Sequence, residues 1–132
     1  MTSEAPPPPA PTAPQVAGID VVEGQLKDAY FDLDRSDIRP DAQQTLTADA
    51  DVLKANPSFK VTVEGHCDER SSEEYNLGLG DRRATAVKDF LANLGVPADR
   101  LTTISYGKDR PQCTESTEEC WQKNRRAHFQ LK

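Results

Sequence analysis

The apolar residues of this chain change their spacing several times along the sequence, and this alternation restricts the possible folds more than any other feature. Residues 60–64 alternate, with Val61 and Val63 between polar neighbours, and a period of two is typical of a strand that packs one face and exposes the other. The segments after Pro40 and after Tyr75 instead repeat their apolar residues at helical spacing. A chain that alternates between these periods is expected to pack helices against a sheet.

The order of elements follows from these periods and from the turn residues between them. Pro40 suits the first turn of a helix, the Asn56-Pro57 pair ends that helix, and Gly95 is placed to end the next one. In chain order we predict a strand over 25–31, a helix over 40–56, a strand over 60–64, a helix from 75 or 77 to 94, a strand over 101–106, a short helix over 118–124 and a strand over 126–131. This order, β-α-β-α-β-(short α)-β, predicts an α+β fold: a two-layer α/β sandwich with a mixed sheet and helices on one face.

Proline marks the boundary of the folded part. Residues 1–17 read MTSEAPPPPAPTAPQVA, and six of the ten prolines fall before residue 15. Because such a tract buries little apolar surface, we predict a Pro-rich flexible linker over 1–17 that acts as an extended tether. The remaining residues, 18–132, are enough for one domain with a single core.

The charge and hydropathy of the chain argue against some classes of function. The formal net charge is −6, which disfavours nucleic-acid binding because phosphate contacts require clustered Lys and Arg. The sequence has no apolar run of about 18 residues, so we expect no membrane-spanning helix. It also shows no signal peptide, and we expect the export signal and the membrane anchor to lie outside this segment.

Two of the three cysteines, Cys113 and Cys120, flank an acidic loop. A disulfide between them would indicate an oxidising compartment, and we favour it over the alternative, a reduced pair in a cytosolic protein. A zinc site is not expected, because neither histidine has ligand spacing to this pair, and no metal or other cofactor is predicted. Cys67 is interpreted as a small buried residue.

Arg83 has an unusual position on the second predicted long helix. With about 100° between successive residues, it falls at the centre of the apolar stripe, whereas its neighbour Arg82 falls on the polar side. A guanidinium that points along a core-facing stripe requires an anion. That anion is either a carboxylate of this chain, which the sequence alone slightly favours, or a ligand carboxylate held by two hydrogen bonds. The stripe consists of Leu79, Val87, Phe90 and Leu94.

Acidic residues gather just after the strand over 60–64. Asp68 lies at the carboxyl edge of that strand, where open α/β sheets bind ligands, although a turn or helix-capping role is the more common explanation. His66 is either a pH-sensitive group or, more commonly, a hydrogen-bonded residue. Catalysis by paired carboxylates is disfavoured, because acidic residues in one exposed loop are usually only solvated. These carboxylates are Asp68, Glu69, Glu73 and Glu74.

Two stretches of the sequence together resemble a known family. Residues 63–70 read VEGHCDER and residues 74–87 read EYNLGLGDRRATAV, which is similar to the signature of the OmpA-like peptidoglycan-binding domain. The Asp-Glu-Arg that follows the histidine is most similar to the peptidoglycan-associated lipoproteins of that family. Further similarity lies in residues 30–38, 105–111 and 123–127, so that the resemblance extends over about residues 25–132.

The resemblance implies a binding protein and not an enzyme. Its ligand would be the peptide stem of peptidoglycan, held non-covalently through meso-diaminopimelate, whose far end carries a carboxylate and an ammonium group. Arg83 matches the family's arginine for the carboxylate, and Asp68 matches the aspartate that faces the ligand's amine or backbone. The other positions that match contact or pocket residues of the family are Asp34, Asn76, Leu79 and Arg126.

The resemblance also implies a cellular setting. A lipid anchor, absent from this chain, would hold the protein at the periplasmic face of the outer membrane. A TolB-like periplasmic protein would be its partner in a Tol–Pal-type system that supports envelope integrity and outer-membrane invagination at cell division. The same domain in a porin or a flagellar stator protein is the alternative. A cell-wall hydrolase is a distant alternative, for which the sequence offers no nucleophile or metal-ligand pattern.

Overall fold

The computed structural model of the chain describes residues 18–132, and the predicted linker over 1–17 lies outside the described residues. The predicted order of elements is found, with a short helix added before the first strand and a 3-10 turn before the third. In chain order the elements are α2 (Ile19–Gln25), β1 (Ala29–Tyr30), α3 (Pro40–Ala55), β2 (Val61–His66), α4 (Glu73–Asn93), η1 (Ala98–Arg100), β3 (Leu101–Gly107), α5 (Glu118–Asn124) and β4 (Arg126–Leu131). None of the helices within residues 18–132 has the length and apolar character that a bilayer crossing requires.

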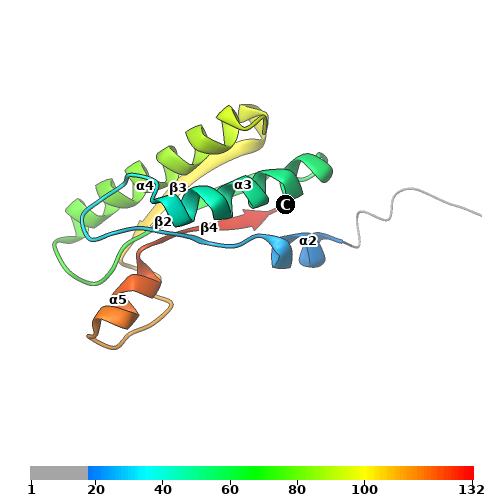
Figure 1. Cartoon of the computed structure of the whole chain (residues 1–132). Coiled ribbons are helices and arrows are strands. Elements are labelled where there is room, and N and C mark those ends of the chain that lie inside the picture. Colours follow the sequence, from blue (N-terminus) through cyan, green and yellow to red (C-terminus); the bar gives the residue numbers. More distant parts are fainter. Residues whose placement is uncertain (1–17) are drawn as a thin grey trace, which may run out of the picture.

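The strands form one mixed sheet in the order β1-β4-β2-β3. β2 runs parallel to β3, whereas β4 is antiparallel to both β2 and β1. The two long helices, α3 and α4, lie side by side over one face of the sheet, and α5 stands apart from them just before β4 (Figure 1). The predicted α+β class, with a mixed sheet and helices packed on one face, is therefore confirmed.

Alternation along the strands directs one set of side chains toward the helices. Val61 and Val63 on β2 are buried, as are Ala127, Phe129 and Leu131 on β4. These side chains form the core together with Ala42, Leu46, Ala50 and Leu53 of α3 and Ala84, Val87 and Leu91 of α4. The other set of strand side chains faces away from the long helices.

The first strand is much shorter than predicted. We expected a strand over 25–31, but Gln25 ends α2, and β1 comprises only Ala29–Tyr30. Between these two elements, the N–H of Lys27 donates to the carboxylate of Asp49 (2.9 Å) and not to a neighbouring strand. Because β1 lies at the edge of the sheet and pairs with β4 alone, it has a backbone partner on one side only.

The start of α4 is set by a capping residue. We predicted a start at Tyr75 or Leu77, but the helix begins at Glu73, because the hydroxyl of Ser72 accepts a hydrogen bond from the N–H of Tyr75 (3.1 Å). The acidic first turn also favours the positive end of the helix dipole. The other end agrees with the prediction, since Gly95 follows the helix with a φ of 104°.

A buried arginine closes the carboxyl-terminal end of α3. Arg100 donates to the carbonyl oxygens of Leu53 (2.9 Å), Asn56 (2.8 Å) and Phe59 (3.0 Å). Carbonyl groups at a helix end lack partners within the helix, and the guanidinium of Arg100 supplies them. In this fold a buried arginine can therefore have a purely structural role, in which its guanidinium donates to backbone carbonyl groups and holds them in place.

Candidate functional site

A small cavity lies at the carboxyl end of β2, beside the first turns of α4. Cys67 and Asp68 come directly after the last residue of β2, and Leu79 of α4 forms a buried apolar wall. The interior is about 10 Å³, which is room for one water molecule at most. The lining residues are Leu33, Asp34, Cys67, Asp68, Arg70, Asn76, Leu79 and Arg83. The structure thus brings together all of the predicted ligand-binding residues except Arg126.

Arg83 is buried, with 1% of its surface exposed, and its guanidinium binds backbone carbonyl groups. Nε donates to the carbonyl of Arg35 (2.8 Å), Nη1 to that of His66 (3.0 Å) and Nη2 to that of Asp32 (2.9 Å). The internal carboxylate that the sequence favoured is not found, since no acidic side chain of residues 18–132 forms an ion pair with Arg83. Arg82 is exposed, as predicted.

Asp68 is the buried carboxylate of the cavity, with 4% of its surface exposed. Its Oδ1 accepts from Nε of Arg70 (3.3 Å) and from the N–H of that residue (3.0 Å). Its Oδ2 accepts from Nη2 of Arg70 (2.7 Å) and from Nη1 of Arg125 (3.3 Å). Burial opposes ionisation, but the hydrogen bonds from the two arginines hold the pKa of Asp68 below its ordinary value. The carboxylate is therefore negatively charged at neutral pH.

The remaining lining residues fix the loops around the cavity. The Nδ2 group of Asn76 donates to the carbonyl of Arg70 (2.6 Å), and the carbonyl of Asn76 accepts from Sγ of Cys67 (3.3 Å). Asp34 adopts a positive φ of 59°, a conformation that Asp tolerates better than most residues. Its carboxylate accepts from the hydroxyl of Tyr75 (3.3 Å). A contact between side chains thus ties the loop after β1 to α4, and contacts between side chains and backbone tie the loop after β2 to the same helix.

The arginine that reaches Asp68 from the region of β4 is Arg125, and the structure does not bring Arg126 to the cavity, contrary to the prediction. Arg126 pairs across the strands with His66, and its Nε lies 3.6 Å from Oδ2 of Asp28. Because neighbouring strand residues point to opposite faces, Arg126 faces away from α4.

The pattern of β4 contained the signal that separates these two arginines. Ala127, Phe129 and Leu131 face the core, so the same alternation places Arg125 on the core side and Arg126 on the other. His66 lies on that other side as well, and its Nε2 is 3.0 Å from Oε1 of Glu64. His66 is thus hydrogen-bonded, in agreement with the more common of its two interpretations.

Residues 113–125 support the loop that carries Asp68. This support was not predicted from the sequence. The indole N–H of Trp121 donates to Oε2 of Glu69 (2.8 Å), and the hydroxyl of Ser116 donates to the same oxygen (2.7 Å). The guanidinium carbon of Arg70 lies 4.0 Å from the centroid of the Trp121 ring, a cation–π contact. These contacts join residues far apart in the chain, and no periodic pattern in the sequence indicates contacts of that kind.

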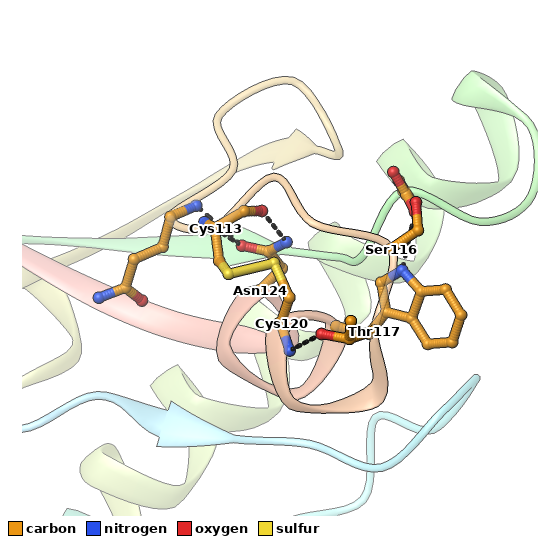
Figure 2. The surroundings of a disulfide bond; sticks show 8 residues. Cys113, Ser116, Thr117, Cys120 and Asn124 are labelled. Carbon is orange, nitrogen blue, oxygen red and sulfur yellow. Dashed lines mark hydrogen bonds between the residues drawn. A yellow bond between two sulfur atoms is a disulfide. The ribbon is translucent and has the colours of Figure 1, made fainter.

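Cys113 and Cys120 form the disulfide that the sequence favoured, with their Cα atoms 5.3 Å apart (Figure 2). Thr117 caps α5, since its hydroxyl accepts from the N–H of Cys120 (3.2 Å). The side chain of Asn124 accepts from the N–H of Cys113 (3.1 Å) and donates to its carbonyl (2.7 Å). The disulfide and the bonds of Asn124 thus join Cys113 to both ends of α5, the helix that carries Trp121. Cys67 is a free, buried cysteine, as predicted.

Metal-ligand chemistry has no visible basis in the described part of the chain. No group of three or more His, Cys, Asp or Glu side chains within residues 18–132 is arranged to hold a metal ion. The cavity instead combines the buried carboxylate of Asp68, the buried guanidinium of Arg83 and an apolar wall, and its lining also includes the more exposed charges of Asp34 and Arg70. This combination suits a small ligand with both a cationic and an anionic group.

Comparison with known proteins identifies the family. The OmpA family matches residues 30–125. The peptidoglycan-associated lipoprotein of Brucella melitensis is 55% identical over 98 residues, which cover 74% of this chain and 58% of that protein. The protein of the same name from Pseudomonas aeruginosa is 40% identical over 128 residues, which cover 90% of this chain and 76% of that protein. The chain therefore spans little more than half of the Brucella relative but three quarters of the Pseudomonas one.

Solved structures agree with this assignment. The crystal structure of the peptidoglycan-associated lipoprotein from Burkholderia pseudomallei superposes with a TM-score of 0.76 at 36% identity, covering 80% of this chain and 90% of that one. The C-terminal domain of Helicobacter pylori MotB, at 21% identity and a TM-score of 0.75 over 80% of this chain and 84% of that one, shares the fold. The chain belongs to the OmpA family and, within it, to the peptidoglycan-associated lipoproteins.

Proposed function

We propose that this protein binds peptidoglycan non-covalently, through the meso-diaminopimelate residue of the stem peptide. The observation that carries the proposal is the pair of opposite charges in one cavity: the carboxylate of Asp68 and the buried guanidinium of Arg83. The far end of diaminopimelate has a carboxylate and an ammonium group beside each other. A zwitterion of this kind can present an anion to Arg83 and a cation to Asp68.

Arg83 supports the proposal because its donors are not all used. Its contacts are three backbone carbonyl oxygens, and a guanidinium has more N–H donors than these three bonds require. Arg100 makes three similar contacts at the end of α3, so the carbonyl contacts alone would indicate only a structural clamp. Arg83 differs from Arg100 because it also lines a cavity that contains a carboxylate.

The setting proposed for this chain follows from its family. Its relatives are named peptidoglycan-associated lipoproteins, and we extend to this chain the role of tethering the outer membrane to the cell wall. In this proposal a lipid anchor holds the protein at the periplasmic face of the outer membrane. A TolB-like protein is its partner in a Tol–Pal-type system that acts in envelope integrity and cell division. The disulfide agrees with an oxidising compartment such as the periplasm.

The direct test measures co-sedimentation of the protein with purified peptidoglycan. Asp68→Asn removes the charge at constant shape, and Arg83→Lys keeps the charge but loses the planar fork. We expect each change to weaken binding by about tenfold or more, because Asp68→Asn removes the buried negative charge and Arg83→Lys removes the forked donors for the ligand's carboxylate. Arg82→Gln is the matched control, since Arg82 is an exposed neighbour on the same helix, and its binding should equal that of the wild type.

A second measurement identifies the ligand group. A soluble stem peptide with meso-diaminopimelate should compete with peptidoglycan, and the same peptide with its side-chain carboxylate amidated should compete much less, because it offers Arg83 no anion. If folded Asp68→Asn and Arg83→Lys variants sediment like the wild type, the cavity is not the binding site. Release of soluble fragments from peptidoglycan would instead indicate a hydrolase.

A further inference from the structure

The carboxylate of Asp68 has no acceptor position left for a ligand. An ionised carboxylate offers about four lone-pair positions. The Oδ1 atom accepts two hydrogen bonds from Arg70, and the Oδ2 atom accepts one from Arg70 and one from Arg125. An ammonium group can therefore bind Asp68 only if one of these donors leaves.

The two arginines differ in how firmly they are held. Arg125 is clamped, because it also donates to the carbonyl of Phe31 (2.9 Å), to Glu118 (2.7 Å) and to Gln122 (3.3 Å), and 4% of its side chain is exposed. The side chain of Arg70 is 33% exposed, and both of its side-chain hydrogen bonds go to Asp68. Arg70 is therefore the donor that can be displaced.

An Arg70 side chain that leaves Asp68 would still have favourable interactions with other nearby groups. Its guanidinium already lies over the ring of Trp121, which is itself held by Glu69. The pKa of Arg70 is raised first by its bonds to Asp68 and further by the nearby carboxylates of Glu118 and Asp34. These two carboxylates and the indole ring offer the cation a place outside the cavity, so the cost of moving it is limited.

We infer that Arg70 occupies, in the free protein, the position that the ammonium group of the ligand takes at Asp68, and that it has to swing out for the ligand to bind. This inference rests on the proposed function. It adds that the guanidinium of Arg70 competes with the ligand's ammonium group for Asp68. It also accounts for the size of the cavity, which holds about 10 Å³ while the side chain of Arg70 lines it. The measured affinity is then lower than the intrinsic affinity by the fraction of molecules in which Arg70 has left Asp68.

The test is a titration of the protein with a soluble stem peptide that contains meso-diaminopimelate, followed by calorimetry. Arg70→Gln removes the competing cation and should raise the affinity by roughly three- to tenfold, the gain expected when a mostly closed site is opened. Arg82→Gln loses the same charge on an exposed site and should leave the affinity unchanged. Arg70→Lys, which keeps the charge but not the forked pair of donors, should give an intermediate affinity.

Tryptophan fluorescence provides an independent readout, because Trp121 is the single tryptophan of the chain. Binding of the peptide to the wild type should change the Trp121 emission as the guanidinium of Arg70 moves. In Arg70→Gln, which has no cation over the ring, the peptide should bind with little change in emission. Circular dichroism establishes that each variant is folded.

Two results would overturn the inference. A folded Arg70→Gln variant that binds the peptide more weakly than the wild type would show that Arg70 contacts the ligand. Equal affinities of Arg70→Gln and the wild type would show that it does not compete. In both cases the wild type still binds the peptide, and the proposed function stands. If the wild type does not bind the peptide, the proposed function fails, and this inference fails with it.

Discussion

Gly65 on β2 and Gly80 on α4 pack backbone against backbone, so that a Cβ atom on Gly65 would overlap the carbonyl group of Gly80. This contact lets the helix approach the strand more closely than side chains would permit. Arg83 follows Gly80 by one helical turn, and its Nη1 reaches the carbonyl of His66 at 3.0 Å. The two glycines therefore determine where the guanidinium of the candidate site lies.

Replacement of Gly65 by alanine should destabilise the fold. The added methyl group meets backbone atoms of Gly80, which cannot rotate away as a side chain can. We expect the free energy of unfolding to fall by about 1–3 kcal/mol, the range for overpacked cores, as measured by urea denaturation. Gly24→Ala is the control, because its Cβ would meet nothing within 4 Å, and alanine should be neutral or slightly stabilising in a helix. Equal stability of Gly65→Ala and the wild type would contradict the proposed close contact.

Asp49 should make the protein less stable as the pH rises toward neutrality. Burial raises the pKa of Asp49 from 3.8 to about 7, and its Oδ2 has no hydrogen-bond partner among the described residues. Between these values the folded state holds a proton that the unfolded state has lost, so stability falls with rising pH. At about 1.4 kcal/mol per pKa unit, the fall from about pH 5 to pH 7 is roughly 2–3 kcal/mol.

Asp49→Asn tests this pH dependence. The amide oxygen can still accept from the N–H of Lys27, but the side chain no longer titrates. In this variant the difference in the free energy of unfolding between about pH 5 and pH 8 should be smaller than in the wild type by roughly 2–3 kcal/mol. Asp51→Asn, an exposed carboxylate on the same helix, should retain the behaviour of the wild type. The assignment fails if both variants show the same pH profile.

Reduction of the disulfide should weaken the support of the candidate site. The closed loop from Cys113 to Cys120 is short, with a sequence separation of 7, and its loss should lower the free energy of unfolding by about 2 kcal/mol. The cap by Thr117 and the contacts of Asn124 remain, so α5 should persist in the folded state. Denaturation with and without a reducing agent measures the effect.

A double variant provides the control for this reduction. A protein with serine at both positions, Cys113→Ser and Cys120→Ser, should match the reduced wild type in stability and should not respond to the reducing agent. If the agent destabilises this variant as much as the wild type, the effect does not come from the disulfide.

Cys67 should be chemically inert in the folded protein. Burial raises the pKa of its thiol to about 11, and the Sγ atom donates to the carbonyl of Asn76. Because the thiolate is the reactive form, labelling by a maleimide near pH 8 should be at least about a hundredfold slower than at an exposed cysteine. Ser58→Cys, at an exposed position, supplies that reference. Rapid labelling of native Cys67 would show that the cavity region opens frequently.

The sequence predicted the elements whose signal is local. The periodicity of α3, the alternation of β2 and β4, and the glycine after α4 led to the right fold class and to bounds that differ by a few residues. Ser72 as the cap of α4 was overlooked, although Ser is a common cap. The strand over 25–31 was wrong, because an edge strand depends on its single neighbour, and no pattern within the segment shows where that pairing stops.

The candidate site was predicted in part, for two different reasons. The placement of Arg83 on the buried stripe follows from helical geometry, and the structure agrees. The roles of Asp34, Asp68, Asn76 and Leu79 came from family resemblance, and the structure brings them to one cavity. Arg126 was assigned without regard to the alternation of β4, which places Arg125 on the side of the cavity.

The sequence by itself determined that Arg83 lies inside the protein, because helical periodicity is a property of neighbouring residues. Only the tertiary structure decided which groups surround it: carbonyl oxygens from segments about 17 to 51 residues away in the chain. The same holds for Asp68, whose donors Arg70 and Arg125 lie 2 and 57 residues away. Hydrogen bonds depend on positions in space, and loops that carry no periodic pattern set these positions. For this reason the charge of each site residue could be read from the sequence, and its partners could not.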